Sequence, residues 1–182
     1  MAASTNLTVT VSSVRNPSTT TTTSSIAITT YYEDISSIVD TLSTGLTVTA
    51  GSVPLQGVSL SSSSYKVGAN SNYTVTIQIS NELPAAFHVE IQLPVDSFSV
   101  NTLLLRSVQV QKPSDSSPTT YSSCSLSTLS SLNVKISSSC FSEALPAQSN
   151  IIVTLGNITN PLSTKPSSSW EVETFFGDRL ME

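Results

Sequence analysis

The sequence predicts an all-β fold, an antiparallel immunoglobulin-like β-sandwich of about ten short strands. Apolar and polar residues alternate with the period of two that a half-buried strand requires, most clearly over residues 73–79 and 87–93. The segment NELPAA, residues 81–86, carries turn residues between them. The two strands are therefore expected to form a hairpin, or to face each other across a sandwich.

The other predicted strands are also short, rich in β-branched residues and bounded by turn residues. They are residues 7–14, 25–32, 45–50, 58–67, 103–111, 132–136, 150–155 and 169–176. One segment, EDISSIVDTL at residues 33–42, has an approximate helical spacing of its apolar residues, although its two adjacent serines lower the helical propensity. A short helix is the alternative to extended chain at this place.

A tandem repeat organises the chain. Residues 6–34 reappear as residues 150–178 at a constant offset of 144, and ten of the 29 aligned pairs are identical. The repeat predicts one main sandwich domain at residues 35–182, of which 35–178 make one whole period. Residues 1–34 are then a terminal strand segment, equivalent to 150–178, that belongs to or completes a neighbouring unit.

The repeated segment suggests how units join. Either the chain is part of a covalent array, or separate subunits associate head to tail by inserting terminal strands into a neighbour's sheet. Both arrangements predict a linear polymer of copies of this chain, and they leave open whether residues 1–34 pair in cis or in trans. The expected inter-unit strand positions are Leu7, Val9, Val11, Ile26, Ile28, Val153, Leu155, Trp170 and Val172. Trp170 replaces Ile26 in the repeat, which favours a packing role over a sugar-stacking platform.

The composition indicates an uncharged, hydroxyl-rich surface. About a third of the residues are Ser or Thr and only 10% are charged. The net charge of −5 and the scattered basic residues argue against binding to nucleic acid. No apolar stretch is long enough to cross a membrane, and MAASTNLTVT lacks the basic and apolar regions of a signal peptide.

Cysteines and glycosylation motifs indicate an extracellular or cell-surface location. Cys124 and Cys140 are expected to form a disulfide, the alternative being two buried thiols. The Asn-X-Ser/Thr acceptors are Asn6, Asn72 and Asn157. Clustered hydroxyl residues near proline are candidates for O-glycosylation, namely Thr19, Thr20, Thr21, Thr22, Thr23, Ser163, Thr164 and Ser167. Asn16 and Asn160 precede proline, so they are expected to mark equivalent turns.

The sequence predicts that the protein is not an enzyme. His88, the sole histidine, lies in an alternating strand and is expected on its solvated face. No GxSxG motif is present, and no second histidine could serve a base or a metal. No cofactor is expected other than covalent glycans, and no metal site is assigned. The weaker alternative is a calcium site formed by Glu33–Asp34 and Glu171–Glu173 with Asp178.

Two segments, VGANSNYTVTIQISNELPAAFHVEIQLP and ITNPLSTKPSSSWEVETF, resemble parts of the Ser/Thr-rich tandem-repeat surface proteins of ciliates and related protists. The overall pattern is similar to that of glycan-coated extracellular fibril proteins. The resemblance implies a secreted or surface-displayed β-sandwich with glycans on Asn and Ser/Thr, and no catalytic residues. The expected function is a structural subunit of an extracellular glycosylated filament. The alternative is a surface adhesin that binds carbohydrate or protein through its loops.

Overall fold

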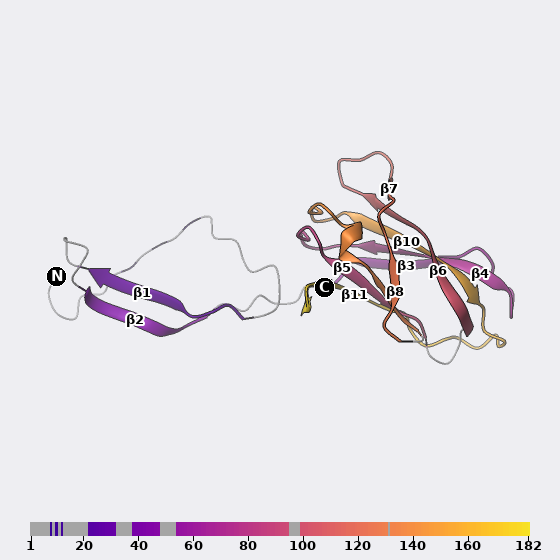
Figure 1. Cartoon of the computed structure of the whole chain (residues 1–182), viewed down its shortest axis with the longest axis horizontal. Coiled ribbons are helices and arrows are strands. Elements are labelled where there is room, and N and C mark those ends of the chain that lie inside the picture. Colours follow the sequence, from indigo (N-terminus) through magenta and orange to yellow (C-terminus); the bar gives the residue numbers. More distant parts are fainter. Residues whose placement is uncertain are drawn as a thin grey trace. The chain divides into compact units, whose positions relative to one another are not determined.

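The computed structural model describes residues 8, 10, 12, 22–31, 38–47, 54–94, 99–130 and 132–182 (Figure 1). These residues form strands and one short 3₁₀ turn at Ser138–Cys140. The chain divides into two compact units: residues 1–17 with 21–50, and residues 51–182 with 18–20. The described part of the first unit is a β-hairpin, and that of the second is a β-sandwich.

The hairpin pairs β1 (Ile26–Tyr31) with β2 (Ile38–Leu46) in antiparallel orientation. The helix considered for residues 33–42 is wrong at residues 38–42, which are extended in β2. The β-branched residues of IVDT lose side-chain freedom in a helix and fit a pleated strand better. The expected domain boundary at residue 34 lies outside the described residues, but the hairpin pairs residues on both sides of it.

The sandwich confirms the predicted fold class, because it consists of two antiparallel sheets of five strands each (Figure 1). The first sheet has the order β3-β4-β10-β6-β7 and the second β12-β11-β5-β9-β8. Their bounds are β3 Gly57–Ser62, β4 Asn70–Gln78, β5 His88–Gln92, β6 Ser99–Gln111, β7 Thr119–Tyr121, β8 Leu126–Thr128, β9 Asn133–Ile136, β10 Asn150–Thr159, β11 Glu171–Phe176 and β12 Arg179–Leu180. β4 and β5 belong to different sheets, so the NELPAA segment crosses the sandwich rather than closing a hairpin.

The core lies between the two sheets and follows the alternation in the sequence. In β4, Tyr73, Val75 and Ile77 are buried, whereas the residues between them are half-buried. β10 lies between β4 and β6 and is the central strand of the first sheet. Phe87 and Phe141 stack at 4.0 Å between ring centroids and are both fully buried. These apolar contacts stabilise the sandwich and position the loops at its ends.

Candidate functional site

The two copies of the repeat form corresponding structure. At an offset of 144 residues, β1 matches residues 170–175, which overlap β11. Each of these strands pairs with an antiparallel strand that follows it, β2 for β1 and β12 for β11, but β12 corresponds to residues 35–36 and not to β2. The turn after β11 contains Gly177 at a φ of 59°, which favours glycine; the first copy has Glu33 there, outside the described residues. Strand β1 is thus the counterpart of β11, which lies between β12 and β5 in the second sheet.

The copies differ in what their apolar residues contact. Trp170 and Val172 are half-buried and pack against the core, and the Trp170 ring lies 5.4 Å from that of Tyr73. Their counterparts Ile26 and Ile28 are 46% and 49% exposed. We call the face that these two isoleucines share the hairpin face. In the first copy, the apolar pair whose counterparts pack against the sandwich core is therefore about half exposed to solvent.

The remaining inter-unit positions have different surroundings. Val153 and Leu155 are fully buried in β10, inside the core of this sandwich. Leu7, Val9 and Val11 lie outside the described residues. An inter-unit role therefore stays a prediction, and Ile26 and Ile28 are the most exposed of the described residues expected to have it.

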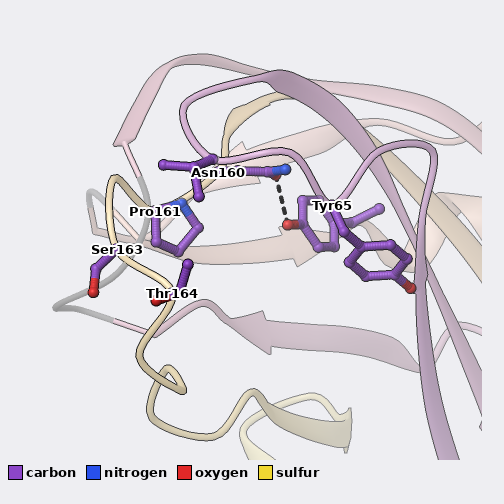
Figure 2. Close-up of a pocket in the computed structure, with 7 residues that line it drawn as sticks. Tyr65, Asn160, Pro161, Ser163 and Thr164 are labelled. Atoms are coloured by element: carbon purple, nitrogen blue, oxygen red, sulfur yellow. Dashed lines mark hydrogen bonds between the residues drawn. The ribbon is translucent and has the colours of Figure 1, made fainter.

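A loop pocket of about 300 Å³ lies just after the C-terminal end of β10 (Figure 2). It is lined by Tyr65, Val67, Tyr73, Asn160, Pro161, Ser163 and Thr164. Tyr65 is 75% exposed, and its hydroxyl accepts a hydrogen bond from the backbone N–H of Ser62 at 3.1 Å. The lining is uncharged and combines aromatic surface with hydroxyl groups, a combination suited to neutral polar ligands.

Asn160 holds the loop pocket together. Its side chain is buried, and its Oδ1 accepts a hydrogen bond from the Tyr73 hydroxyl at 2.7 Å. Its Nδ2 donates to the carbonyl oxygens of Ser64 and Lys66, both at 2.8 Å. The amide therefore fixes the loop before β4 to the end of β10, and these bonds occupy both of its polar atoms. The sequence predicted a turn here and missed this role, although the Asn-Pro pair shared by both repeats was a signal for it.

The structure joins Cys124 and Cys140 by a disulfide. Cys140 is buried in the 3₁₀ turn, whereas Cys124 is half-buried just before β8. Beside this region the Glu143 carboxylate accepts hydrogen bonds from Lys112 at 2.8 Å and from the Tyr121 hydroxyl at 2.7 Å. Burial and the Glu143 bond raise the pKa of Tyr121 to about 12. Both bonds lower the pKa of Glu143.

The glycosylation candidates lie in different environments. Asn72 is exposed on β4, whereas Asn157 is half-buried, has a φ of 68° and accepts a hydrogen bond from Asn70 at 2.9 Å. Asn6 lies outside the described residues. Among the O-glycosylation candidates, Thr22, Ser163, Thr164 and Ser167 are exposed, Thr23 is half-buried, and Thr19, Thr20 and Thr21 lie outside the described residues.

The expected solvated position of His88 is wrong. His88 is only 5% exposed, because the ring of Phe175 on the adjacent strand stacks on it at 5.2 Å. Its Nε2 lies 3.3 Å from Oε1 of Glu90. Burial and the nearby Lys135 lower the pKa of His88, an effect that Glu90 partly offsets. The imidazole is packed on the second sheet, and His88 is not among the residues that line the loop pocket.

Within the described ranges, no group of three or more His, Cys, Asp or Glu side chains is placed to hold a metal ion. Glu171 and Glu173 are exposed on β11, and Glu33–Asp34 lie outside those ranges. No described helix is long and apolar enough to span a membrane.

No protein-family model matches the chain, and no curated protein matches it. Among solved structures, it is similar to the CBM3a-L domain of scaffoldin CipA from the cellulosome of Clostridium thermocellum, with 12% identity over 70% of this chain and 91% of that chain and a TM-score of 0.45. A family IIIa CBD from Clostridium cellulolyticum has 14% identity over 68% and 94%, with a TM-score of 0.38. The collagen-binding domain of surface protein RspB from Erysipelothrix rhusiopathiae has 10% identity over 89% and 50%, with a TM-score of 0.36. Similarity at this level carries no argument about function.

Proposed function

We propose that the chain is a structural unit of an extracellular, glycosylated filament, and that units associate through the repeated segment. The observation that carries the proposal is the hairpin face. Ile26 and Ile28 match Trp170 and Val172, which pack against a sandwich core, yet the two isoleucines are about half exposed. In the described hairpin, no core covers these two isoleucines, although their counterparts in the sandwich are covered by one.

Burial of the two isoleucine side chains would favour association. Covering the exposed half of an isoleucine removes apolar surface from water and contributes about 1 to 2 kcal/mol per side chain. Two such side chains favour association without making it strong by themselves, so strand pairing must add to the interface. When copies of one chain bind head to tail through two different surfaces, they form an open linear polymer, unless the rotation from one copy to the next closes a ring.

The surface chemistry supports an extracellular setting for this role. The Cys124–Cys140 disulfide fits an oxidising compartment. Asn72 and the hydroxyl residues after Pro161 are exposed and accessible to modifying enzymes. A glycosylated fibril protein similar to the Ser/Thr-rich repeat proteins of protists would combine these features. We infer a structural rather than a catalytic role, since the sole histidine is buried against Phe175.

Electron microscopy and sedimentation velocity of the purified chain test this proposal. We expect concentration-dependent linear assemblies from the wild type and loss of assembly in the double variant Ile26→Ser, Ile28→Ser. Leu162→Ser is a matched control, because Leu162 is 86% exposed in a loop without a counterpart in the hairpin strands. Single dispersed particles at every concentration would overturn the proposal, as would equal loss of assembly in the Leu162 variant.

A second candidate function is that of a surface adhesin, favoured by the concave loop pocket beside the exposed Tyr65 ring. Its weakness is that the polar atoms of Asn160 are already bonded within the protein. Recognition would depend on the Tyr65 ring and the hydroxyls of Ser163 and Thr164. A glycan array screened with the wild type and with Tyr65→Ala separates the two functions: binding that Tyr65→Ala abolishes would favour the adhesin.

A further inference from the structure

The two sheets of the sandwich differ in charge. The strands of the second sheet carry charged residues at Glu90, Lys135, Glu171, Glu173 and Arg179. The strands of the first sheet carry one charged residue, Arg106 in β6. Because the inward residues of both sheets form an apolar core, the outward surface of the first sheet consists mainly of hydroxyl and amide side chains. We call the outward surface of β3, β4, β10 and β6 the neutral face.

The neutral face presents its polar groups in rows. Paired residues of neighbouring strands lie on the same side of a sheet. One such row consists of Ser61, Thr74, Thr154 and Ser107. Within it, Oγ1 of Thr74 and Oγ1 of Thr154 lie 3.2 Å apart. Hydroxyl groups both donate and accept hydrogen bonds without a charge, so this surface matches the hydroxyl groups of a carbohydrate.

Asn72 and Arg106 lean toward each other over this face. Both are exposed, and β10 lies between their strands. Gly156 of β10 has no side chain to separate them. A Cβ atom at Gly156 would lie 2.8 Å from Oδ1 of Asn72 and 2.5 Å from Nε of Arg106, closer than real Cβ atoms approach other atoms. The Asn72 amide therefore lies over β10 beside the guanidinium group.

Arg106 has no carboxylate partner in the part of the chain that the structure describes. The ion pairs found there are His88–Glu90 and Lys112–Glu143. The guanidinium group holds five N–H donors in a planar fork, and it binds oxygen acceptors. A sugar ring with an N-acetyl group supplies such acceptors without a charge. The one charged residue of the first sheet thus lies where a sugar on Asn72 would begin.

We propose that an N-linked glycan on Asn72 lies on the neutral face, with its first N-acetylhexosamine over Gly156 and hydrogen-bonded to Arg106. The inference rests on the glycosylation in the proposed function and gives one glycan a defined place. Asn72 is the acceptor of the motif Asn72-Tyr73-Thr74. In the attachment step, Nδ2 of Asn72 bonds to the anomeric carbon of a lipid-diphosphate-linked oligosaccharide. The lipid diphosphate leaves with the electron pair of the broken C–O bond, and the amide loses one proton.

A glycan in this place would cover a surface that has little charge of its own. The carboxylates of Glu90, Glu171 and Glu173 in the second sheet repel the same groups of another copy. The neutral face has no comparable repulsion, because Arg106 is its single charge. The bulk of the glycan would keep neutral faces of different copies apart. Association would then be directed to the hairpin face.

Nuclear Overhauser contacts test the proposal on the glycosylated full chain, produced with isotope labels in a eukaryotic secretory host. We expect contacts from the first sugar of the Asn72 glycan to the Arg106 side chain and to the Thr154 methyl group. These contacts need no variant, so the test remains decisive if a substituted chain fails to fold. A glycan on Asn72 without contacts to the protein would overturn the proposal, as would the absence of a glycan at Asn72.

Thermal unfolding of paired variants gives a second test. Asn72→Gln should lower the Tm by about 3 °C in the wild-type background and by less than about 1 °C in an Arg106→Ala background. Arg179→Ala is the matched control, because it removes an exposed arginine from the second sheet and should leave the full effect of Asn72→Gln. Equal effects in the Arg106 and Arg179 backgrounds would overturn the contact with Arg106.

Electron microscopy of the same glycosylated material separates this inference from the proposed function. Linear assemblies of a chain whose Asn72 glycan makes no contacts to the neutral face would overturn the inference and leave the structural function standing. Sugar contacts to Arg106 in a chain that never assembles would support the inference and count against the filament.

Discussion

Asn160→Asp should be strongly disruptive for a substitution that changes so few atoms, because Asn160 makes three hydrogen bonds in a buried site. The change keeps the side-chain shape and keeps Oδ1, which accepts the Tyr73 hydroxyl bond of 2.7 Å. It replaces the amide nitrogen, which donates to the carbonyl oxygens of Ser64 and Lys66, by a second acceptor. Two hydrogen bonds are lost, and a carboxylate oxygen then faces two carbonyl oxygens in a buried site.

The magnitude follows from these contacts. Each lost bond contributes about 1 kcal/mol net, and the unpaired buried oxygens add to the cost, so the free energy of unfolding should fall by about 3 kcal/mol. With an unfolding entropy of roughly 2.1 cal/mol/K per residue over a unit that spans residues 51–182, the Tm should fall by about 10 °C. Tyr73→Phe, which removes one of the three bonds, should cost about 1 kcal/mol.

Differential scanning calorimetry of the two variants at pH 7 and pH 4 checks this reasoning. The carbonyl oxygens disfavour the charged form of the introduced carboxyl, so its pKa should be raised in the folded state. Protonation also restores one donor, and the destabilisation should therefore be smaller at pH 4 than at pH 7. A Tm within about 3 °C of the wild type at pH 7, or no difference between the two pH values, would refute the role assigned to Asn160.

Three further predictions concern other parts of the chain. Replacing Cys124 and Cys140 by serine should lower the free energy of unfolding by about 3 kcal/mol, measured by urea denaturation; an equal midpoint in wild type and variant would contradict this. Because the pKa of His88 is lowered in the folded state, its contribution to stability is present above pH ~6.5 and is lost as the pH falls through the folded pKa. Tm should therefore drop between pH 7 and pH 5, and His88→Phe should flatten that slope; an unchanged slope would contradict the assignment. Mass spectrometry of native material should find higher glycan occupancy at Asn72 than at the half-buried Asn157, and the reverse order would count against the exposed-acceptor reasoning.

The fold class follows from local patterns that do not depend on distant residues. The alternation in residues 73–79 and 87–93 is a property of each strand alone, and the structure buries its apolar members. The choice between a hairpin and a crossing for the NELPAA segment could not be made in this way. It depends on β10, which is more than 70 residues away from β4 and occupies the position beside it.

The candidate site was harder to predict because its contacts are between distant residues. His88 alternates like a solvated residue, and only the neighbouring strand reveals that Phe175 covers it. Asn160 bonds to residues 87 to 96 positions earlier in the chain. The Asn-Pro pair occurs at the same place in both repeats, but such a pair is equally compatible with a turn and with a buried asparagine that bonds to several backbone groups.

The central position of β10 has a consequence for the order in which the chain folds. The first sheet cannot form its β4–β10–β6 core until residues 150–159 are available, so its nucleus requires contacts of long sequence separation and should form slowly. Residues 6–15 carry a diverged copy of β10 and leave the ribosome before residues 150–159 do. During synthesis, this diverged copy is therefore available to β4 before residues 150–159 have been made. We expect differences such as Arg15 in place of Thr159 to disfavour the pairing of residues 6–15 with β4, and so to limit the misassembly to which repetitive chains are prone.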